Sequence, residues 1–131
     1  MLPHYLAVNL PQQPKEGTNM KRITAIIRPE KLEQVRQALE KVGYSGLMIS
    51  EIQGHGKQKG IVQQWRGEKY KVDLISKVKM EIVVKDSEVS VIKKTIVENA
   101  RTGEIGDGKI FISNIDEVIR IRTGEEGETA L

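Results

Sequence analysis

Residues 102–111, with the sequence TGEIGDGKIF, combine three glycines with one lysine, which are residue types that bind phosphate groups. Glycines let successive backbone N–H groups turn toward one point, and Lys109 adds a positive charge beside them. A Walker-type loop follows a strand and opens a helix, whereas this segment follows a predicted helix and opens a predicted strand. Because an ordinary helix-to-strand turn also needs glycines, the segment alone favours a phosphate site and a simple turn about equally.

Two arginines further along the chain strengthen the phosphate interpretation. Arg120 and Arg122 lie two positions apart in a strand predicted over residues 117–123, so both side chains point to the same side. Two guanidinium groups that face one way repel each other unless an anion lies between them. That anion is either a bound phosphate or a neighbouring carboxylate such as Glu125, and the sequence leaves both open.

A third segment, residues 54–60 (GHGKQKG), again places glycines among side chains that donate hydrogen bonds. Each of the three segments is a weak signal by itself. Together they predict a polyphosphate site built from three loops, of one subunit or of neighbouring subunits.

Catalysis is not indicated by the remaining residues. The chain has no cysteine, which excludes disulfides, thiolate metal sites and cysteine nucleophiles. Its two histidines are His4 and His55, and there is no Ser-His-Asp set, HExxH motif or convincing carboxylate pair. We therefore expect a protein that is not an enzyme.

Length and charge indicate one domain with a phosphate-bearing or otherwise anionic partner. The chain has 131 residues, a net charge of +3, and a basic excess concentrated between residues 54 and 79. No apolar run reaches the roughly 18 residues of a membrane helix. Residues 1–19 carry three prolines and no basic start, so we expect a disordered extension before a domain over 20–131.

The apolar residues predict the same order of elements twice. A strand over 20–27, a helix over 29–43 and a strand over 44–53 form one unit. A strand over 78–84, a helix over 89–100 and a strand over 109–113 form another, before the strand over 117–123. This βαββαβ order predicts an α+β, ferredoxin-like fold with an extra C-terminal strand.

Residues 56–74 interrupt this order without a usable period. A loop of about this length inside a compact domain is functional or disordered more often than structural. It carries Trp65, the only tryptophan, and Tyr70 among basic residues, which favours a role as an anchor for a partner.

The chain resembles the PII family of nitrogen-regulatory signal proteins, most closely the GlnK type. The resemblance covers residues 20–131 and rests on TGEIGDGKIF, IIRPEKLEQVRQAL, GKQKGI, YKVDLISKVKMEIVV and VIRIRTGEEG. It implies a cytoplasmic homotrimer that binds ATP or ADP in clefts between subunits. Residues of about 56–74 would be its T-loop, about 101–109 its B-loop and about 120–131 its C-loop.

The resemblance also implies the residues of the nucleotide site. Phosphates would be held by Gly106, Asp107, Gly108 and Lys109, with Arg120 and Arg122 reaching across the interface. The base, the ribose and the T-loop side of the site would be contacted by Ile26, Gly54, Gly56, Lys57, Gln58 and Val83. A Mg²⁺ ion held by ATP phosphates and Gln58 would bind 2-oxoglutarate, together with Lys59, Gly60 and Lys77.

The resemblance further implies an ammonium transporter as partner, with Arg66 at the loop tip plugging the pore, and membrane contact through that transporter alone. Tyr70 matches a tyrosine that is uridylylated in some bacterial members. The chain departs from the family at Trp65, at the Glu68-Lys69 pair, at Met48 and at Ser76. These departures argue against uridylylation, a side-chain contact to the adenine at position 48 and a stiff return of the loop.

Three alternatives stay open beside the transporter. The first is regulation of glutamine synthetase or another nitrogen enzyme. The second is an RNA-binding module of similar fold, which would need exposed aromatic side chains on its sheet, and Phe111 is the only phenylalanine. The third is a small acylphosphatase-like hydrolase, which would leave the long basic loop unexplained. We expect no nucleic-acid partner.

Overall fold

The computed structural model describes residues 19–55, 61–65, 68–72 and 74–131, so almost all of the extension predicted over 1–19 lies outside them. Four strands form one antiparallel sheet in the order β2–β5–β1–β6, namely β1 (Met20–Ile27), β2 (Met48–His55), β5 (Leu74–Lys85) and β6 (Lys109–Asn114). The chain order of these strands, with one helix in each strand–helix–strand unit, confirms the ferredoxin-like prediction.

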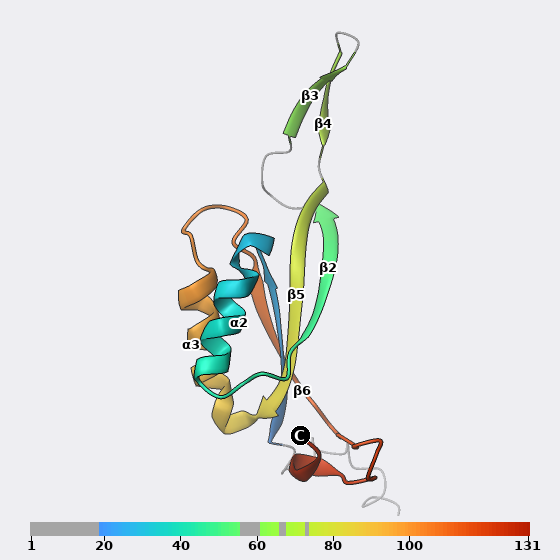
Figure 1. Cartoon of the computed structure of the whole chain (residues 1–131). Coiled ribbons are helices and arrows are strands. Elements are labelled where there is room, and N and C mark those ends of the chain that lie inside the picture. The colour runs from blue at the N-terminus through green and yellow to red at the C-terminus, as the bar shows by residue number, and fades with distance from the viewer. Residues whose placement is uncertain (1–18, 56–60, 66–67, 73) are drawn as a thin grey trace, which may run out of the picture.

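Two helices, α2 (Leu32–Lys41) and α3 (Val89–Ala100), cover one face of this sheet (Figure 1). A short 3-10 turn precedes each helix, η1 (Pro29–Lys31) before α2 and η2 (Asp86–Glu88) before α3. The apolar residues of the two helices pack on alternate residues of β1 and β5, and this core consists of side chains at most 7% exposed: Ile23, Ala25, Ile27, Val35, Leu39, Val78, Met80, Ile82, Val84, Ile92, Ile96 and Ala100.

The opposite face of the sheet, here called the open face, carries no helix of the described chain (Figure 1). Its side chains come from the alternate positions, including Arg22, Thr24, Ile26, Met48, Lys77, Lys79, Glu81, Val83, Lys109 and Phe111. Phe111 is 56% exposed and is the one aromatic side chain of this face in the part of the chain that the structure describes. A single aromatic ring is fewer than the stacking platform of an RNA-binding sheet requires.

The long segment contains more regular structure than the sequence suggested. The strands β3 (Ile61–Trp65) and β4 (Glu68–Val72) pair antiparallel as a hairpin, and β5 begins at Leu74 rather than at the predicted Val78. The two hairpin strands pair with each other and belong to a separate two-stranded sheet. They therefore lack the alternating apolar pattern that packing against a core imposes on a strand.

The start of β2 and the C-terminal region also differ from the predictions. β2 begins at Met48 instead of residue 44, because residues 43–47 turn at the end of α2, where the N–H of Tyr44 donates to the carbonyl of Leu39 (2.9 Å). The C-terminal strand predicted over 117–123 is wrong, since that region has one isolated bridge between Ile119 and Glu126.

The C-terminal region turns because its backbone groups bond locally. The N–H of Arg120 donates to the carbonyl of Glu125 (2.8 Å), and the N–H of Gly124 donates to the carbonyl of Arg120 (2.7 Å). Gly124 has φ +73°, which reverses the chain direction. The alternating isoleucines of this region are 54% and 99% exposed at positions 119 and 121, so their spacing does not reflect a buried strand face.

Candidate functional site

The glycine-rich loop over residues 101–109 connects α3 to β6, and the carboxylate of Asp107 anchors it from within. This carboxylate accepts hydrogen bonds from the N–H groups of Thr102 (2.9 Å) and Gly103 (2.8 Å) and from the Thr102 hydroxyl. These donors, the Thr102 groups first, hold the pKa of Asp107 well below its usual range. The Asp107 side chain is therefore committed to the loop, and its predicted contact with a phosphate is left to its backbone N–H.

Arg28, which directly follows β1, is a second anchor of this loop. Its Nε lies 3.0 Å from the Asp107 carboxylate, and its Nη2 donates to the carbonyl of Ile105 at 2.8 Å. Reasoning from the sequence assigned no role to Arg28, because 79 positions separate it from Asp107. A single charged residue at the end of a buried strand, just before a helix-starting proline, is the signal that could have found it.

Lys77 of β5, predicted to pair with a carboxylate of 2-oxoglutarate, contacts the same loop. Its ammonium group donates a hydrogen bond to the carbonyl of Gly106. Burial first, and the neighbouring Arg28 guanidinium second, lower the pKa of Lys77. Lys77 and Arg28 thus place two cations at one end of the open face.

Three backbone donors of the loop are unpaired. Within the part of the chain that the structure describes, the N–H groups of Gly106, Asp107 and Gly108 donate no hydrogen bond. Lys109 is exposed and follows them directly, with no ion pair to another described residue. Successive unpaired N–H groups beside a lysine are the arrangement that binds an anion such as phosphate.

Gly108 fits only because it has no side chain. A Cβ atom at this position would lie 1.7 Å from the carbonyl oxygen of Ile26, and the residue has φ +99°. The loop therefore lies directly against the end of β1. This contact holds the unpaired N–H groups at a fixed place beside Ile26 and Lys109, which are register partners.

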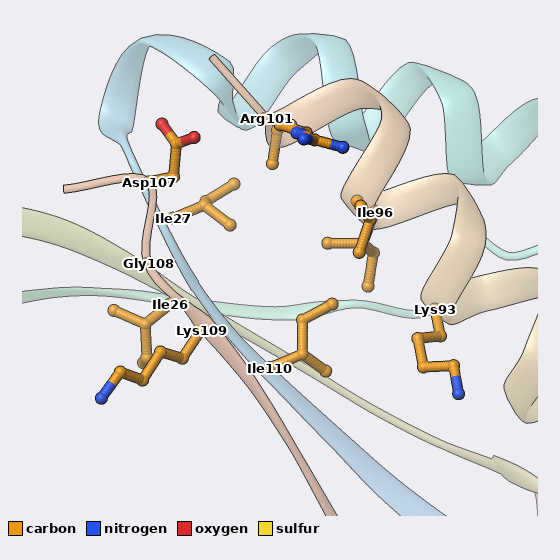
Figure 2. Close-up of a pocket in the computed structure, with 11 residues that line it drawn as sticks. Ile26, Ile27, Lys93, Ile96, Arg101, Asp107, Gly108, Lys109 and Ile110 are labelled. Atoms are coloured by element: carbon orange, nitrogen blue, oxygen red, sulfur yellow. The ribbon is translucent and has the colours of Figure 1, made fainter. Parts of the chain in front are cut away.

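A cavity of about 300 Å³ lies between the C-terminal half of α3 and the start of β6 (Figure 2). We call it the α3–β6 cavity; its apolar lining consists of Ile26, Ile27, Ile96, Val97, Ala100 and Ile110. In Figure 2 the side chains of Ile26 and Lys109 point to one side, away from those of Ile96 and Ile110. The cavity thus lies mainly on the helix side of β6, and the Lys109 ammonium group does not point into it.

The two predicted phosphate arginines differ in their surroundings. Arg120 pairs with the carboxylate of Glu125 (3.1 Å) and donates to the carbonyls of Thr129 (3.0 Å) and Leu131 (3.4 Å). Of the two anions that the sequence left open, a phosphate or a carboxylate such as Glu125, the carboxylate is therefore the partner of Arg120 in the described subunit. Arg122 is exposed and has no partner among the described residues.

The predicted site residues lie at two opposite ends of the sheet (Figure 1). Ile26, Lys77 and the glycine loop lie at the end of β1, whereas Val83 pairs with Arg22 near its start. The chain leading to Arg120 leaves the sheet at that start, where the N–H of residue 115 donates to the carbonyl of Met20. Six residues of β1 span about 20 Å. One subunit therefore keeps the two groups apart.

Several predicted residues fall outside this description. Gly56, Lys57, Gln58, Lys59, Gly60 and Arg66 lie outside the described residues. Gly54 lies on β2 opposite Ile75, and Tyr70 lies on β4 opposite Gln63. Met48 and Ser76, two departures from the family pattern, are both exposed.

Neither a membrane helix nor a metal site is found in the described part of the chain. None of its helices is both long and apolar enough to cross a membrane. No group of three or more His, Asp or Glu residues in the described ranges could hold a metal ion.

Comparison with known proteins gives one consistent family. Residues 20–125 match the model of the family described as nitrogen regulatory protein P-II. Nitrogen regulatory protein P-II 2 of Methanothermobacter thermautotrophicus is 56% identical over 112 residues, which cover 86% of this chain and 97% of the relative. Nitrogen regulatory protein P-II 1 of Escherichia coli K12 is 52% identical over 112 residues, covering 86% of this chain and all of the relative.

A solved structure is similar over the same part of the chain. The crystal structure of Arabidopsis thaliana PII bound to citrate aligns with a TM-score of 0.71 and 44% identity, covering 86% of this chain and 92% of the plant chain.

Proposed function

The chain belongs to the nitrogen regulatory protein P-II family, and on this premise we propose that it is a GlnK-type sensor of ATP or ADP and 2-oxoglutarate. Members of this family are regulatory signal-transduction proteins rather than enzymes. The observation that carries the proposal is the row of unpaired N–H groups at residues 106–108, followed by the exposed Lys109. An adenine nucleotide supplies the polyphosphate that such a row binds.

The proposed nucleotide site requires two copies of the chain. Trimers are typical of the family. In a trimer, the glycine loop of one copy faces Arg120, Arg122 and Val83 of the next, which closes the separation of about 20 Å along β1. The open face, with Met48 and Phe111 each 56% exposed, supplies an apolar surface for this contact.

The residues present suit a triphosphate and its metal ion. Within one copy, Gly106, Asp107 and Gly108 donate backbone hydrogen bonds to phosphate oxygens, while Lys109 offsets their charge. Ile26 lies beside Lys109 on the open face, where it can contact the ribose or base. We further assign Gly54, Gly56, Lys57 and Gln58 to the T-loop side of this site. Gln58, together with the phosphates, would hold a Mg²⁺ ion, which would supply positive charge for binding a second anion.

We assign 2-oxoglutarate to the space beside Lys77, with Gln58, Lys59 and Gly60 as further contacts. A small dianion binds there when the metal and Lys77 offset its charge, so its affinity depends on the nucleotide. The protein then responds to both ligands together. The hydrogen bond from Lys77 to Gly106 connects β5 with the glycine loop. β5 directly follows the β3–β4 hairpin in the chain. This contact favours a route from the ligands to the partner-binding segment.

Calorimetric titration with 2-oxoglutarate tests this function. With saturating Mg-ATP we expect binding at least about tenfold tighter than without nucleotide, within the range typical of coupled sites. Titration in the presence of Mg-ADP is the matched control, because it tests whether the third phosphate of ATP is needed for binding of the acid. Equal binding of the acid with and without nucleotide, or no nucleotide binding at all, contradicts the sensor proposal.

An ammonium transporter is the proposed partner, and Arg66 of the T-loop (about 56–74) is the proposed plug. An arginine in a narrow pore blocks it sterically and adds a charge that ammonium cannot pass. This places the protein in the cytoplasm, at the membrane through the transporter alone. Glutamine synthetase or another nitrogen enzyme is the alternative partner, and Tyr70 is the candidate for modification.

We expect Arg66→Ala to relieve most of the inhibition of ammonium uptake while ATP affinity stays unchanged, because position 66 belongs to the loop tip and not to the nucleotide site. Uptake into vesicles that contain the transporter measures the first effect and calorimetry the second. Lys69→Ala is the control for loss of one loop charge. Undiminished inhibition by Arg66→Ala excludes the plug assignment.

Glu125→Gln is expected to tighten ATP binding about two- to threefold, because a carboxylate 3.1 Å from Arg120 competes with phosphate for the guanidinium group. The gain should shrink at high salt, which screens exposed charges. Glu126→Gln, at the adjacent exposed position, is the matched control. Weaker binding by Glu125→Gln would instead mean that Glu125 holds Arg120 in its binding position.

A further inference from the structure

Ile121 is the most exposed large apolar side chain of the described structure. It is 99% exposed, whereas the next most exposed, Ile105, is 70% exposed. It lies between Arg120 and Arg122 in a turn. A fully exposed isoleucine between two arginines has no role in the packing of its own subunit, and its side chain is available for contact with a second copy of the chain.

The α3–β6 cavity is an apolar space of suitable size with no assigned occupant. Six of its lining residues are apolar, and it holds about 300 Å³. Lys93 and Arg101, which also line it, are exposed and have no ion pair with another described residue (Figure 2). The cavity therefore suits an apolar side chain that comes with acidic neighbours.

The position of the cavity at the edge of the sheet relates it to the proposed nucleotide site. β6 is an edge strand, with the open face on one side and the α3–β6 cavity on the other. In the described subunit residues 120–124 form a turn, in which the N–H of Gly124 donates to the carbonyl of Arg120. The contact with a partner requires this turn to open into an extended segment along the edge, in which successive side chains alternate between the two sides. If residues 120 and 122 reach the phosphates on the open face, residue 121 points to the side of the cavity.

We propose that Ile121 of the partner subunit fills the α3–β6 cavity and so fixes the two arginines at the glycine loop. This rests on the proposed trimer and deepens its nucleotide site. Charge complementarity supports the choice of occupant, since the exposed Glu126 and Glu128 follow Ile121 in the sequence and the cavity is lined by Lys93 and Arg101. The partner's side chain thereby anchors a contact that phosphates alone would leave mobile.

Disulfide trapping tests the contact directly, because the natural chain has no cysteine. We expect the double variant Val97→Cys with Ile121→Cys to form covalent dimers and trimers under mild oxidation with ATP present. Val97 lines the cavity, and the C-terminal segment after β6, which contains Ile121, lies at the opposite end of the sheet of its own subunit (Figure 1). The control pairs Ile121→Cys with Val91→Cys, which is similarly exposed on α3 but does not line the cavity.

A second variant tests the energetic contribution. Ile121→Asp should raise the concentration at which the trimer dissociates by more than about tenfold, since burying a carboxylate in an apolar cavity is unfavourable. Val91→Asp should leave it within about twofold. Light scattering over a dilution series gives both values, and the exposure of Ile121 means that its replacement leaves the subunit folded.

The outcomes separate this inference from the proposed function. Rapid trapping at 97 and 121, with dissociation of the Ile121→Asp trimer, supports the contact. If the disulfide between positions 97 and 121 forms no faster than that of the control pair, and the trimer still binds ATP, the proposed contact is wrong and the proposed nucleotide site stands. A wild-type chain that is monomeric and does not bind ATP overturns both.

Discussion

Gly108→Ala is expected to lose at least about 100-fold in affinity for ATP and about 2–4 kcal/mol in free energy of unfolding. The added Cβ would lie 1.7 Å from the carbonyl oxygen of Ile26 and 2.7 Å from its carbonyl carbon. Both are backbone atoms, so no side chain can rotate away to relieve the clash. The loop or the end of β1 must move, and either movement displaces the unpaired N–H groups from Lys109.

Gly103→Ala provides the control for backbone conformation. Gly103 has φ +91°, close to the φ of +99° at Gly108, but a Cβ there would meet no atom within 4 Å. The control should cost about 1 kcal/mol, the penalty of a left-handed conformation alone. Denaturant unfolding measures the stability of both variants and calorimetry their ATP affinity. Equal effects of the two substitutions would contradict the role of the close contact with Ile26.

Asp107→Asn is expected to weaken ATP binding about 10- to 30-fold, the opposite of what removing a negative charge near a triphosphate predicts. The carboxylate accepts from two backbone N–H groups, the Thr102 hydroxyl and Arg28. An amide replaces one accepting oxygen by a donor that faces other donors. The loop then loses its anchor, and the N–H groups of residues 106–108 move from their positions beside Lys109.

Glu104→Gln is the matched control, because it removes the same charge from the same loop at an exposed side chain. It should leave ATP affinity unchanged or slightly tighter. If Asp107→Asn also tightens binding, then Asp107 acts by charge repulsion and not as an anchor. Titration of both variants with ATP at one fixed salt concentration distinguishes the two mechanisms.

The low pKa of Asp107 sets the pH range over which its carboxylate stabilises the fold. A carboxyl group with a depressed folded-state pKa stabilises the fold above its unfolded pKa of about 4 and loses that contribution as the pH falls through its folded value. The difference in free energy of unfolding between the wild type and Asp107→Asn should therefore be constant around neutral pH. This difference should diminish only in strong acid.

Patterns of burial made much of the fold predictable. β1 and α3 begin and end where the apolar spacing indicated, at Met20–Ile27 and Val89–Ala100, because each buries one face against the core. The hairpin β3–β4 was not predicted, since it is held by pairing between its own strands. The C-terminal strand was wrongly predicted for a related reason, because the isoleucines at 119 and 121 alternate without being buried.

The candidate site was predictable in part. Three glycines and a lysine identified the loop, because anion binding needs close backbone approach and positive charge together. The sequence could not reveal that Asp107 faces into the loop or that Arg28 reaches it, since both depend on how the end of β1 meets the segment after α3. The contact between Lys77 and Gly106 also depends on strand register.

The division of the predicted site between the two ends of the sheet has a genetic consequence under the proposed assembly. A cell that expresses wild-type and defective chains together would build mixed trimers. In these trimers, each defective glycine loop would inactivate one cleft, and each defective C-terminal segment would inactivate another. Such alleles would be partly dominant. Two alleles with defects at opposite ends, each inactive alone, would complement each other, because a mixed trimer contains a cleft with both walls intact.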